Sequence, residues 1–164
     1  MATVHELADV LGEEAAIYDL LVSAAKRKKD IVIRNDLPAL DAVMQEENDA
    51  AGRLMRLERR RLSLSKSLGG ILSIEENKIT VMSIASKLSD NEEAERLRLL
   101  AKRLRAQITE LQGINGDVVA LIEGTLEYIE FSINAIRART GLNIDKGRGA
   151  LIRHEGKSLI DVKG

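Results

Sequence analysis

Apolar residues recur every three or four positions through three long stretches of the chain, with polar residues between them. This spacing places the apolar residues on one face of an α-helix, whereas a half-buried strand would show strict alternation. The longest stretch runs from about residue 90 to residue 139. Its apolar seam comprises Leu97, Ala101, Leu104, Ile108, Leu111, Asn115, Val118, Ile122, Thr125, Ile129 and Ile136. The pattern predicts a long helix over 90–139 that packs on other helices.

The ends of this stretch carry residues that are typical of helix caps. Residues 89–91 can accept hydrogen bonds from free backbone amides, and residues 137–141 end the stretch with cations followed by glycine. Two glycines within residues 113–116 argue for a break, because each glycine costs a helix interior about 1 kcal/mol relative to alanine. The apolar register nevertheless passes through this segment without a phase shift. We therefore predict one continuous helix.

Two shorter amphipathic stretches come first, at about 3–34 and 37–69. Asp36 is a good N-cap, and Pro38 is tolerated in the first turn of a helix but not in its interior. The connection is therefore only a few residues long, which makes the first two helices antiparallel neighbours. The pair Gly69-Gly70 is expected to end the second helix.

The remaining segments complete an all-α prediction. Thr80 can cap a short helix over about 80–88, and residues 141–164 hold too few apolar positions to bury a helix face, so we expect a flexible C-terminal tail. The predicted fold is an antiparallel bundle or coiled coil of three long helices with a short connecting helix. It forms a single domain over residues 1–140.

Composition agrees with long amphipathic helices. The 164 residues are 45% hydrophobic and 31% charged, with one proline and 2% aromatic residues. A formal net charge of -1 gives no global attraction to nucleic acid or anionic membrane. The chain has no cysteine, which fits a reducing compartment, and neither a signal-peptide pattern nor an apolar run long enough for a membrane span. We expect a cytoplasmic protein without stable membrane insertion.

The sequence offers little for catalysis or cofactor binding. His5, Asp9 and Glu13 are spaced by single helical turns and could form a surface metal site, but ligands on a first turn are usually solvated. His154 stands far from them, without a nucleophile pattern around it. Residues 156–158 read Gly-Lys-Ser but lack the first glycine of a phosphate-binding loop. We therefore expect no enzyme activity, no metal and no cofactor.

The second half of the second helix is basic. It carries five arginines and a lysine against a single acid, Glu58. The cations are Arg53, Arg56, Arg59, Arg60, Arg61 and Lys66. They could form an anion-binding face, or a solvated stripe paired with acids of neighbouring helices. We favour the second interpretation and expect no nucleic-acid partner, because no aromatic residues alternate with the cations.

The late part of the long helix is apolar and acidic. Residues 111–136 include 14 apolar residues and four acids but no base, and the apolar arc is wider than one neighbouring helix can cover. A closed bundle, in which this helix faces both others, would explain the arc. Alternatively, the helix projects beyond its shorter neighbours and needs a partner. The candidate partner-binding residues are Leu121, Leu126, Tyr128, Ile129, Phe131, Ile133 and Ile136.

Several short motifs follow one another along nearly the whole chain. They are Leu72-Ser73-Ile74-Glu75-Glu76 with Ile79-Thr80, Ala94-Glu95-Arg96-Leu97 with Leu104-Arg105, Asn115, Leu121-Ile122, Leu126-Glu127-Tyr128-Ile129, and Ser158-Leu159-Ile160-Asp161 within a Leu-Ile-Asp-x-Lys ending. In this order they resemble the FlgN family of flagellar export chaperones. Each motif alone is weak, and their order is what is specific.

The resemblance implies a cytoplasmic, non-enzymatic chaperone. Such a protein holds the hook-associated proteins of the hook-filament junction through their C-terminal helical segments and presents them at the type III export gate. In the family the late part of the chain engages the substrate, which coincides with the candidate residues above. One alternative is a structural coiled-coil adaptor that self-associates through the same surface. Another is an anion or nucleic-acid binder that uses residues 53–66.

Overall fold

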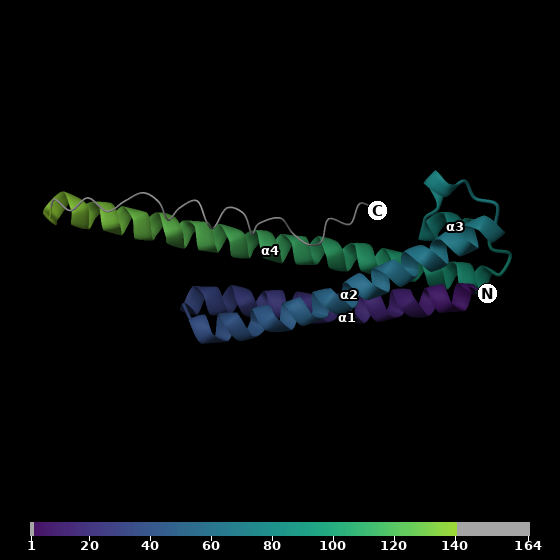
Figure 1. Cartoon of the computed structure of the whole chain (residues 1–164), viewed down its shortest axis with the longest axis horizontal. Coiled ribbons are helices and arrows are strands. Elements are labelled where there is room, and N and C mark those ends of the chain that lie inside the picture. The colour runs from purple at the N-terminus through teal and green to yellow at the C-terminus, as the bar shows by residue number, and fades with distance from the viewer. Residues whose placement is uncertain (1, 141–164) are drawn as a thin grey trace.

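The structure, a computed structural model, describes residues 2–140, which form four α-helices and one short 3-10 helix (Figure 1). The elements are α1 (Val4–Arg34), α2 (Leu37–Ile71), η1 (Glu76–Lys78), α3 (Val81–Lys87) and α4 (Asn91–Thr140). Helices make up 91% of the described residues, which contain no strand. The all-α prediction is confirmed, and the predicted tail lies outside the described residues. No helix in 2–140 combines the length and apolarity that a membrane crossing requires.

Helix α1 is the centre of the arrangement, because it packs against α2 on one side and α4 on another (Figure 1). Helices α1 and α2 form an antiparallel hairpin, and α4 runs parallel to α1. Ion pairs along α1 and α4 show this parallel register: Asp9–Arg96 at 3.2 Å, Lys26–Glu110 at 3.0 Å and Lys29–Asp117 at 3.0 Å. Helices α2 and α4 make no extensive contact with each other. The structure therefore does not confirm the closed antiparallel bundle of three helices.

The short helix α3 packs on the first part of α4 and also contacts α2. Its residues Ile84 and Ala85 are buried, and the Thr80 hydroxyl accepts a hydrogen bond from the Ser83 amide at 3.0 Å, as the predicted cap requires. At this end of the molecule α3 contacts both α2 and α4. In a closed bundle these two long helices would contact each other directly there.

Two residues make the turn between α1 and α2. Asn35 has a left-handed conformation with φ of 56°, and the Asp36 amide donates back to the Ile31 carbonyl at 3.3 Å. The Asp36 carboxylate then accepts from the Ala39 amide at 3.1 Å, which caps α2 as predicted. The same two residues end one helix and begin the next, so the hairpin is tight.

The prediction that Gly69-Gly70 ends α2 is wrong. Gly69 lies inside the helix and is buried, and a Cβ atom there would lie 2.5 Å from Cδ1 of Ile79. The glycine therefore allows the connecting segment to approach closely. The helix ends at Ile71, and Ser73 adopts φ of 57° while the Ile74 amide donates to the Gly69 carbonyl at 2.8 Å.

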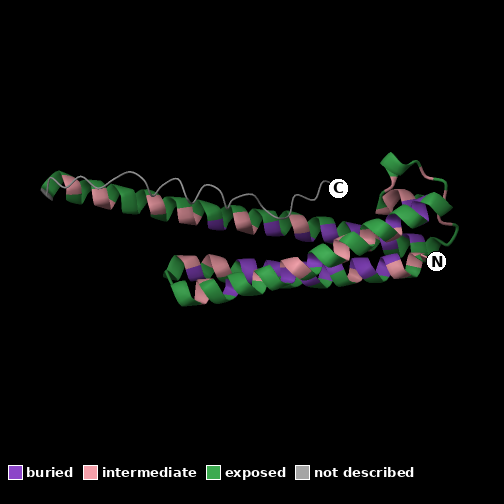
Figure 2. Cartoon of the chain, viewed as in Figure 1, coloured by how far each residue is buried: buried purple, intermediate pink, exposed green. Residues whose placement is uncertain are grey.

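The core lies where α1 meets both of its neighbours. Leu7, Leu11 and Leu97 are 1% exposed or less, and the buried seam of α4 continues through Leu111 to Val118. Figure 2 shows buried residues along α1 and along the first half of α4. Helix α4 is continuous through the glycines of 113–116, as the unbroken register predicts. Burial of these side chains is the main source of stability, at about 25 cal/mol per Å² of apolar surface.

Three ion pairs lie between α1 and α2: Glu14–Arg61 at 3.1 Å, Lys28–Glu47 at 2.9 Å and Arg27–Glu46 at 2.5 Å. Glu14 is only 2% exposed, and burial raises the pKa of its carboxyl while the neighbouring Arg61 opposes that shift. Burial, with the negative charges of Glu58 and Glu14, also raises the pKa of Tyr18 to about 12. The hairpin therefore contains a buried carboxylate, and the cost of burying it is offset by the positive charge of Arg61.

Candidate partner-binding surface

Helix α4 extends well beyond the α1–α2 turn (Figures 1 and 2). Val118 is the last buried residue of α4, and Asp117 makes the last ion pair to α1. No residue from 119 to 139 is buried. We call residues 119–139 the α4 tip. At 1.5 Å per residue it is about 30 Å long.

The α4 tip is helical although none of its residues from 119 to 139 is buried. Two hydroxyls donate to carbonyls one turn earlier, Thr125 to Leu121 and Ser132 to Tyr128, each at 2.9 Å. Gly124 has open space where a Cβ atom would stand, so no close packing requires a glycine there. Because isolated helices of this length are marginal in water, the tip is the least stable part of the helix.

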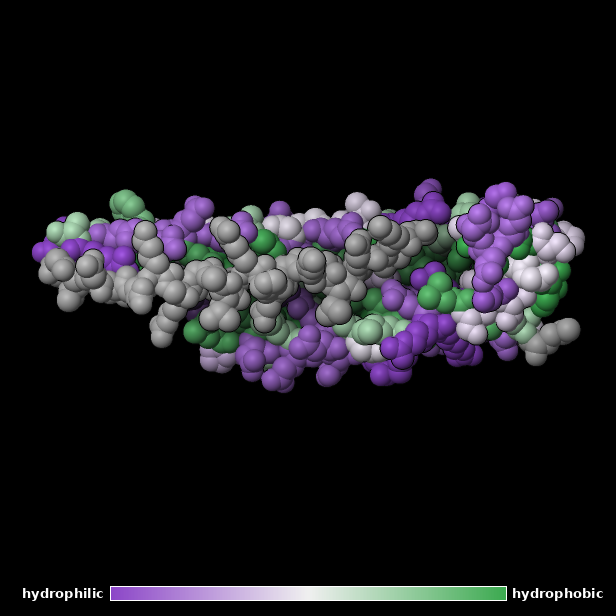
Figure 3. Space-filling view, turned by 45° about the horizontal axis from the view of Figure 1, so that its top comes forward, coloured by the Kyte–Doolittle hydropathy of each residue, from purple (hydrophilic) through white to green (hydrophobic). Residues whose placement is uncertain are grey.

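All seven candidate partner-binding residues lie on the α4 tip. Phe131 is 72% exposed and Tyr128 71%, and Ile129 is 45% exposed. The others are exposed or half-buried: Ile136 is 55% exposed, and Leu121, Leu126 and Ile133 are intermediate. The space-filling view shows apolar residues among hydrophilic ones at this end of α4 (Figure 3). The closed bundle is therefore not the source of the wide apolar arc, because neither α1 nor α2 covers it.

The structure brings these residues to one segment but not to one face. Leu126, Ile129 and Ile133 are spaced by three and four residues. They continue the apolar seam that packs against α1 in the earlier part of α4. Phe131 follows Ile129 by two residues, which places it about 200° away around the helix. Tyr128 also lies off this seam. The α4 tip thus presents an aliphatic stripe on one side and two aromatic rings elsewhere.

Carboxylates occupy a third part of the tip surface. Glu123, Glu127 and Glu130 are exposed and form no ion pair among the described residues. Their spacing of four and three residues places them on a common flank of the helix. Any helix that docks beside them experiences a negative potential.

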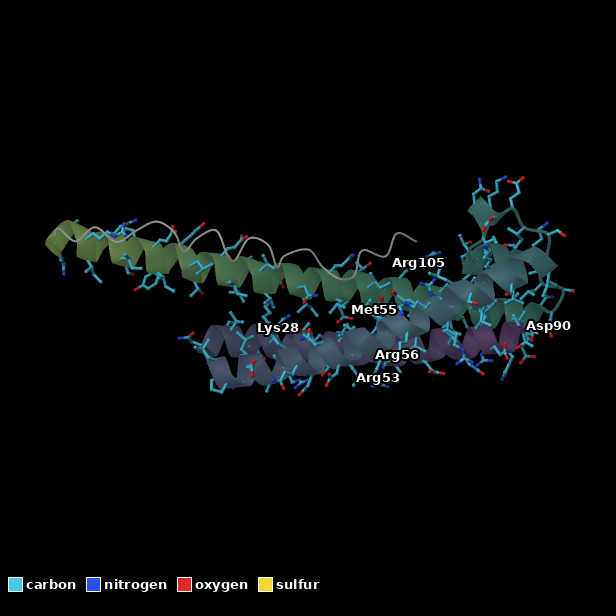
Figure 4. All side chains as sticks on the ribbon, in the orientation of Figure 1. Lys28, Arg53, Met55, Arg56, Asp90 and Arg105 are labelled. Carbon is cyan, nitrogen blue, oxygen red and sulfur yellow. The ribbon has the colours of Figure 1, made fainter. Side chains whose placement is uncertain are left out.

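The basic half of α2 divides into two sets. Arg61 pairs with Glu14, and Lys66 pairs with Glu76 at 2.8 Å. The other four cations, Arg53, Arg56, Arg59 and Arg60, are exposed and form no ion pair within the part of the chain that the structure describes. The expectation that these four pair with acids of neighbouring helices is wrong, because they lie on the outer side of α2. Figure 4 shows Arg53 and Arg56 on the side away from α4.

The first turn of α1 does not present a free carboxylate to a metal. The Asp9 carboxylate lies 3.2 Å from the Arg96 guanidinium and 3.5 Å from His5, whose ring is 3.3 Å from the same guanidinium. A cation already occupies the place between these side chains. No cluster of three potential metal ligands occurs in residues 2–140.

An open groove of about 750 Å³ between α1 and α4 was not expected from the sequence. Small residues Ala8, Gly12 and Ala16 line its α1 side, and Leu99, which is 59% exposed, lies on its α4 side. The recurrence of small residues every four positions was the signal that could have indicated a shallow helix surface there.

The chain matches a known protein family. A family model described as FlgN protein matches residues 1–144. No match was found among curated proteins or among solved structures. The matched range includes every described helix and the whole α4 tip.

Proposed function

The chain belongs to the FlgN family, and we propose that it is a non-enzymatic cytoplasmic chaperone of flagellar protein export. In this proposal it binds hook-associated proteins through their C-terminal helical segments and delivers them to the type III export gate. The family match supports the class of function. The observation that carries the binding mode is the α4 tip, an apolar helix surface that α1 and α2 leave uncovered.

The proposed binding mode is helix on helix. A partner helix lies along the aliphatic stripe of Leu126, Ile129 and Ile133, with apolar residues at i, i+3, i+4 and i+7. Because Tyr128 and Phe131 lie elsewhere on the tip, a second segment of the partner contacts the aromatic rings. The partner thereby supplies the packing that α1 and α2 supply to the earlier part of α4.

Charge adds a requirement on the partner. Since Glu123, Glu127 and Glu130 border the apolar surface and no base occurs in residues 111–136, a partner helix with lysine or arginine beside its apolar face is favoured. A partner with acids at those positions is disfavoured by like-charge repulsion. Electrostatic attraction of this kind mainly raises the association rate, so binding should weaken as salt is added.

The test compares binding with stability in a single variant, Phe131→Ala. We expect it to weaken binding to the C-terminal segment of a hook-associated protein by about 30-fold, or about 2 kcal/mol. It should cost the free protein less than half of the 3–5 kcal/mol typical of a buried phenylalanine, because this ring is 72% exposed. Isothermal titration and chemical denaturation give the two values.

Leu99→Ala is the matched control, because Leu99 is an exposed apolar residue of α4 outside the tip. It should leave binding unchanged. Unchanged binding in Phe131→Ala would refute the proposed surface. A loss of stability as large as for a core residue would show instead that the ring is part of the folded core.

A further inference from the structure

The outer side of α2 carries four exposed cations. Arg53, Arg56, Arg59 and Arg60 form no ion pair within residues 2–140. We call these four residues the basic face of α2. They span about 10 Å along the helix, and like charges one turn apart repel one another. The basic face is therefore suited to an anionic partner.

The acids of α2 do not offset this positive charge. Glu58 is the only acid in residues 50–74, and it is half-buried. Its charge acts on Tyr18 of α1, which places Glu58 on the side of α2 that faces α1. The nearest exposed acid along α2 is Asp49, one turn before Arg53. The outer side of α2 beyond that turn is locally positive, although the whole chain has a formal net charge of -1.

Two exposed apolar side chains border the basic face. Met55 is 45% exposed and Leu62 is 61% exposed. Steps of four and three residues, from Met55 to Arg59 to Leu62, place these three side chains along one line of the helix. Figure 4 shows Met55 and Arg56 on opposite edges of α2, and helical geometry places Arg59 between them. The surface thus combines guanidinium groups with apolar groups that still contact water.

The shape of this surface favours a bilayer over a peptide. Two grooves among residues 2–140 lie between α1 and α4, and α2 lines neither of them. The outer face of a helix is convex, so a peptide docked there would leave most of its own surface in water. Mobile lipid headgroups can gather around a convex cationic face and admit apolar side chains among them. Residues 50–74 contain no aromatic residue that could stack on the bases of a nucleic acid.

We propose that the basic face of α2 binds the surface of an anionic lipid bilayer. Helix α2 lies parallel to the membrane plane, its arginines contact the phosphates of the headgroups, and Met55 and Leu62 enter the headgroup layer. The contact is peripheral, and no helix crosses the bilayer. Salt screens charges beyond about 8 Å, so the bilayer responds to the nearby arginines rather than to the net charge of the chain.

Membrane binding through α2 is separate from the function proposed above. The basic face and its two apolar neighbours all lie on α2, whereas the candidate partner-binding residues all lie on the α4 tip. A chain docked on a bilayer therefore keeps the α4 tip available for a partner helix. The two proposals rest on different residues, so either can fail without the other.

The test is co-sedimentation of the full chain with lipid vesicles. Phosphatidylcholine vesicles with about 30% phosphatidylglycerol should bind the protein at about 100 mM NaCl and release it at about 500 mM NaCl. Vesicles of phosphatidylcholine alone should not bind it. Arg59→Glu/Arg60→Glu should lower the binding constant for the anionic vesicles at least about tenfold. Both side chains are exposed, so this variant should keep the circular dichroism spectrum and the denaturation midpoint of wild type.

The matched control is Arg34→Glu/Lys87→Glu, which changes the net charge by the same amount. Both residues are exposed and form no ion pair among the described residues, and they end α1 and α3, away from the basic face. This variant should bind the anionic vesicles as wild type does. Phe131→Ala, which tests the α4 tip, should also leave vesicle binding unchanged.

A second variant separates lipid from soluble polyanions. Met55→Ser/Leu62→Ser should lower binding to the anionic vesicles at least about fivefold, because less apolar surface then leaves water. Polyglutamate and duplex RNA, tested in the same buffer, should not bind wild type. Wild type that does not bind the anionic vesicles, unchanged binding in Arg59→Glu/Arg60→Glu, or an equal loss in the control would each overturn the proposal. Binding of polyglutamate or RNA that does not depend on Met55 and Leu62 would also overturn it, in favour of an acidic protein or a nucleic acid as the partner.

Discussion

Removing the Arg61 guanidinium should destabilise the protein in a pH-dependent way. Glu14 is 2% exposed, and Arg61 at 3.1 Å forms its only ion pair within the described residues. In Arg61→Leu the carboxylate remains buried without compensation, which typically costs about 3–5 kcal/mol. The carboxyl can instead become protonated, and that alternative sets an upper limit on the penalty.

The limit follows from the ordinary pKa of 4.5. Protonating such a carboxyl at pH 7 costs about 3.4 kcal/mol, since each pH unit corresponds to about 1.4 kcal/mol, and at pH 5 it costs only about 0.7 kcal/mol. Without Arg61 the folded-state pKa of Glu14 rises further above the unfolded value. A raised carboxyl pKa gives a stability contribution that is present below the unfolded pKa and is lost as pH rises through the folded pKa. The variant should therefore be much closer to wild type at pH 5 than at pH 7.

The assay is urea denaturation of wild type and Arg61→Leu at both pH values, followed by circular dichroism. In Glu14→Gln/Arg61→Leu the loss of unfolding free energy relative to wild type should be the same at pH 5 and pH 7, because this variant lacks the titrating carboxyl. Arg59→Leu is a control from the same turn, since Arg59 is exposed and lacks an ion pair. An equal loss at pH 5 and pH 7 in Arg61→Leu, or a pH effect that persists in the double variant, would refute the reasoning.

Three further outcomes are expected. Gly69→Ala should cost about 1–3 kcal/mol in denaturation, because the new methyl meets Ile79, whereas Gly70→Ala, which has open space, should cost nothing. Gly124→Ala should stabilise the α4 tip by up to about 1 kcal/mol and slow its amide hydrogen exchange, and unchanged exchange would contradict a helical tip. Arg59→Glu/Arg60→Glu should change the free energy of unfolding by less than about 0.5 kcal/mol, and micromolar, salt-sensitive binding of wild type to duplex DNA or RNA would contradict the expected absence of a nucleic-acid partner.

Local features of the fold could be predicted because they depend on neighbouring residues. Asp36 and Thr80 cap helices through their own side chains, and the seam through Leu97, Leu104 and Leu111 is buried as its spacing indicates. The arrangement of the long helices could not be predicted in the same way. A seam shows which face of a helix is covered but not which helix covers it, and here α1 alone covers most of α4.

Two other outcomes needed information that lies far away in the chain. Gly69 appears in the sequence as a helix stop, but its role is set by Ile79, which follows ten residues later. Pairing of Arg61 but not of Arg59 or Arg60 depends on which side of α2 faces Glu14. By contrast, the division of the candidate site into an aliphatic stripe and separate aromatic rings could have been predicted, because helical geometry alone places Phe131 opposite Ile129.

The parallel pairing of α1 with α4 has a consequence for the order of folding. Residues that meet across this interface are far apart in sequence, as in Arg96 with Asp9, which are 87 positions apart. Contacts within the α1–α2 hairpin have shorter sequence separations, 19 positions for Lys28–Glu47 and 47 for Glu14–Arg61, so the hairpin can form first, with the α4-facing surface of α1 still open to water. That surface closes only as the segment from Leu97 to Val118 becomes available, during synthesis or refolding. Folding of the core is then complete, and residues 119–139 of α4 add length without adding to the buried core.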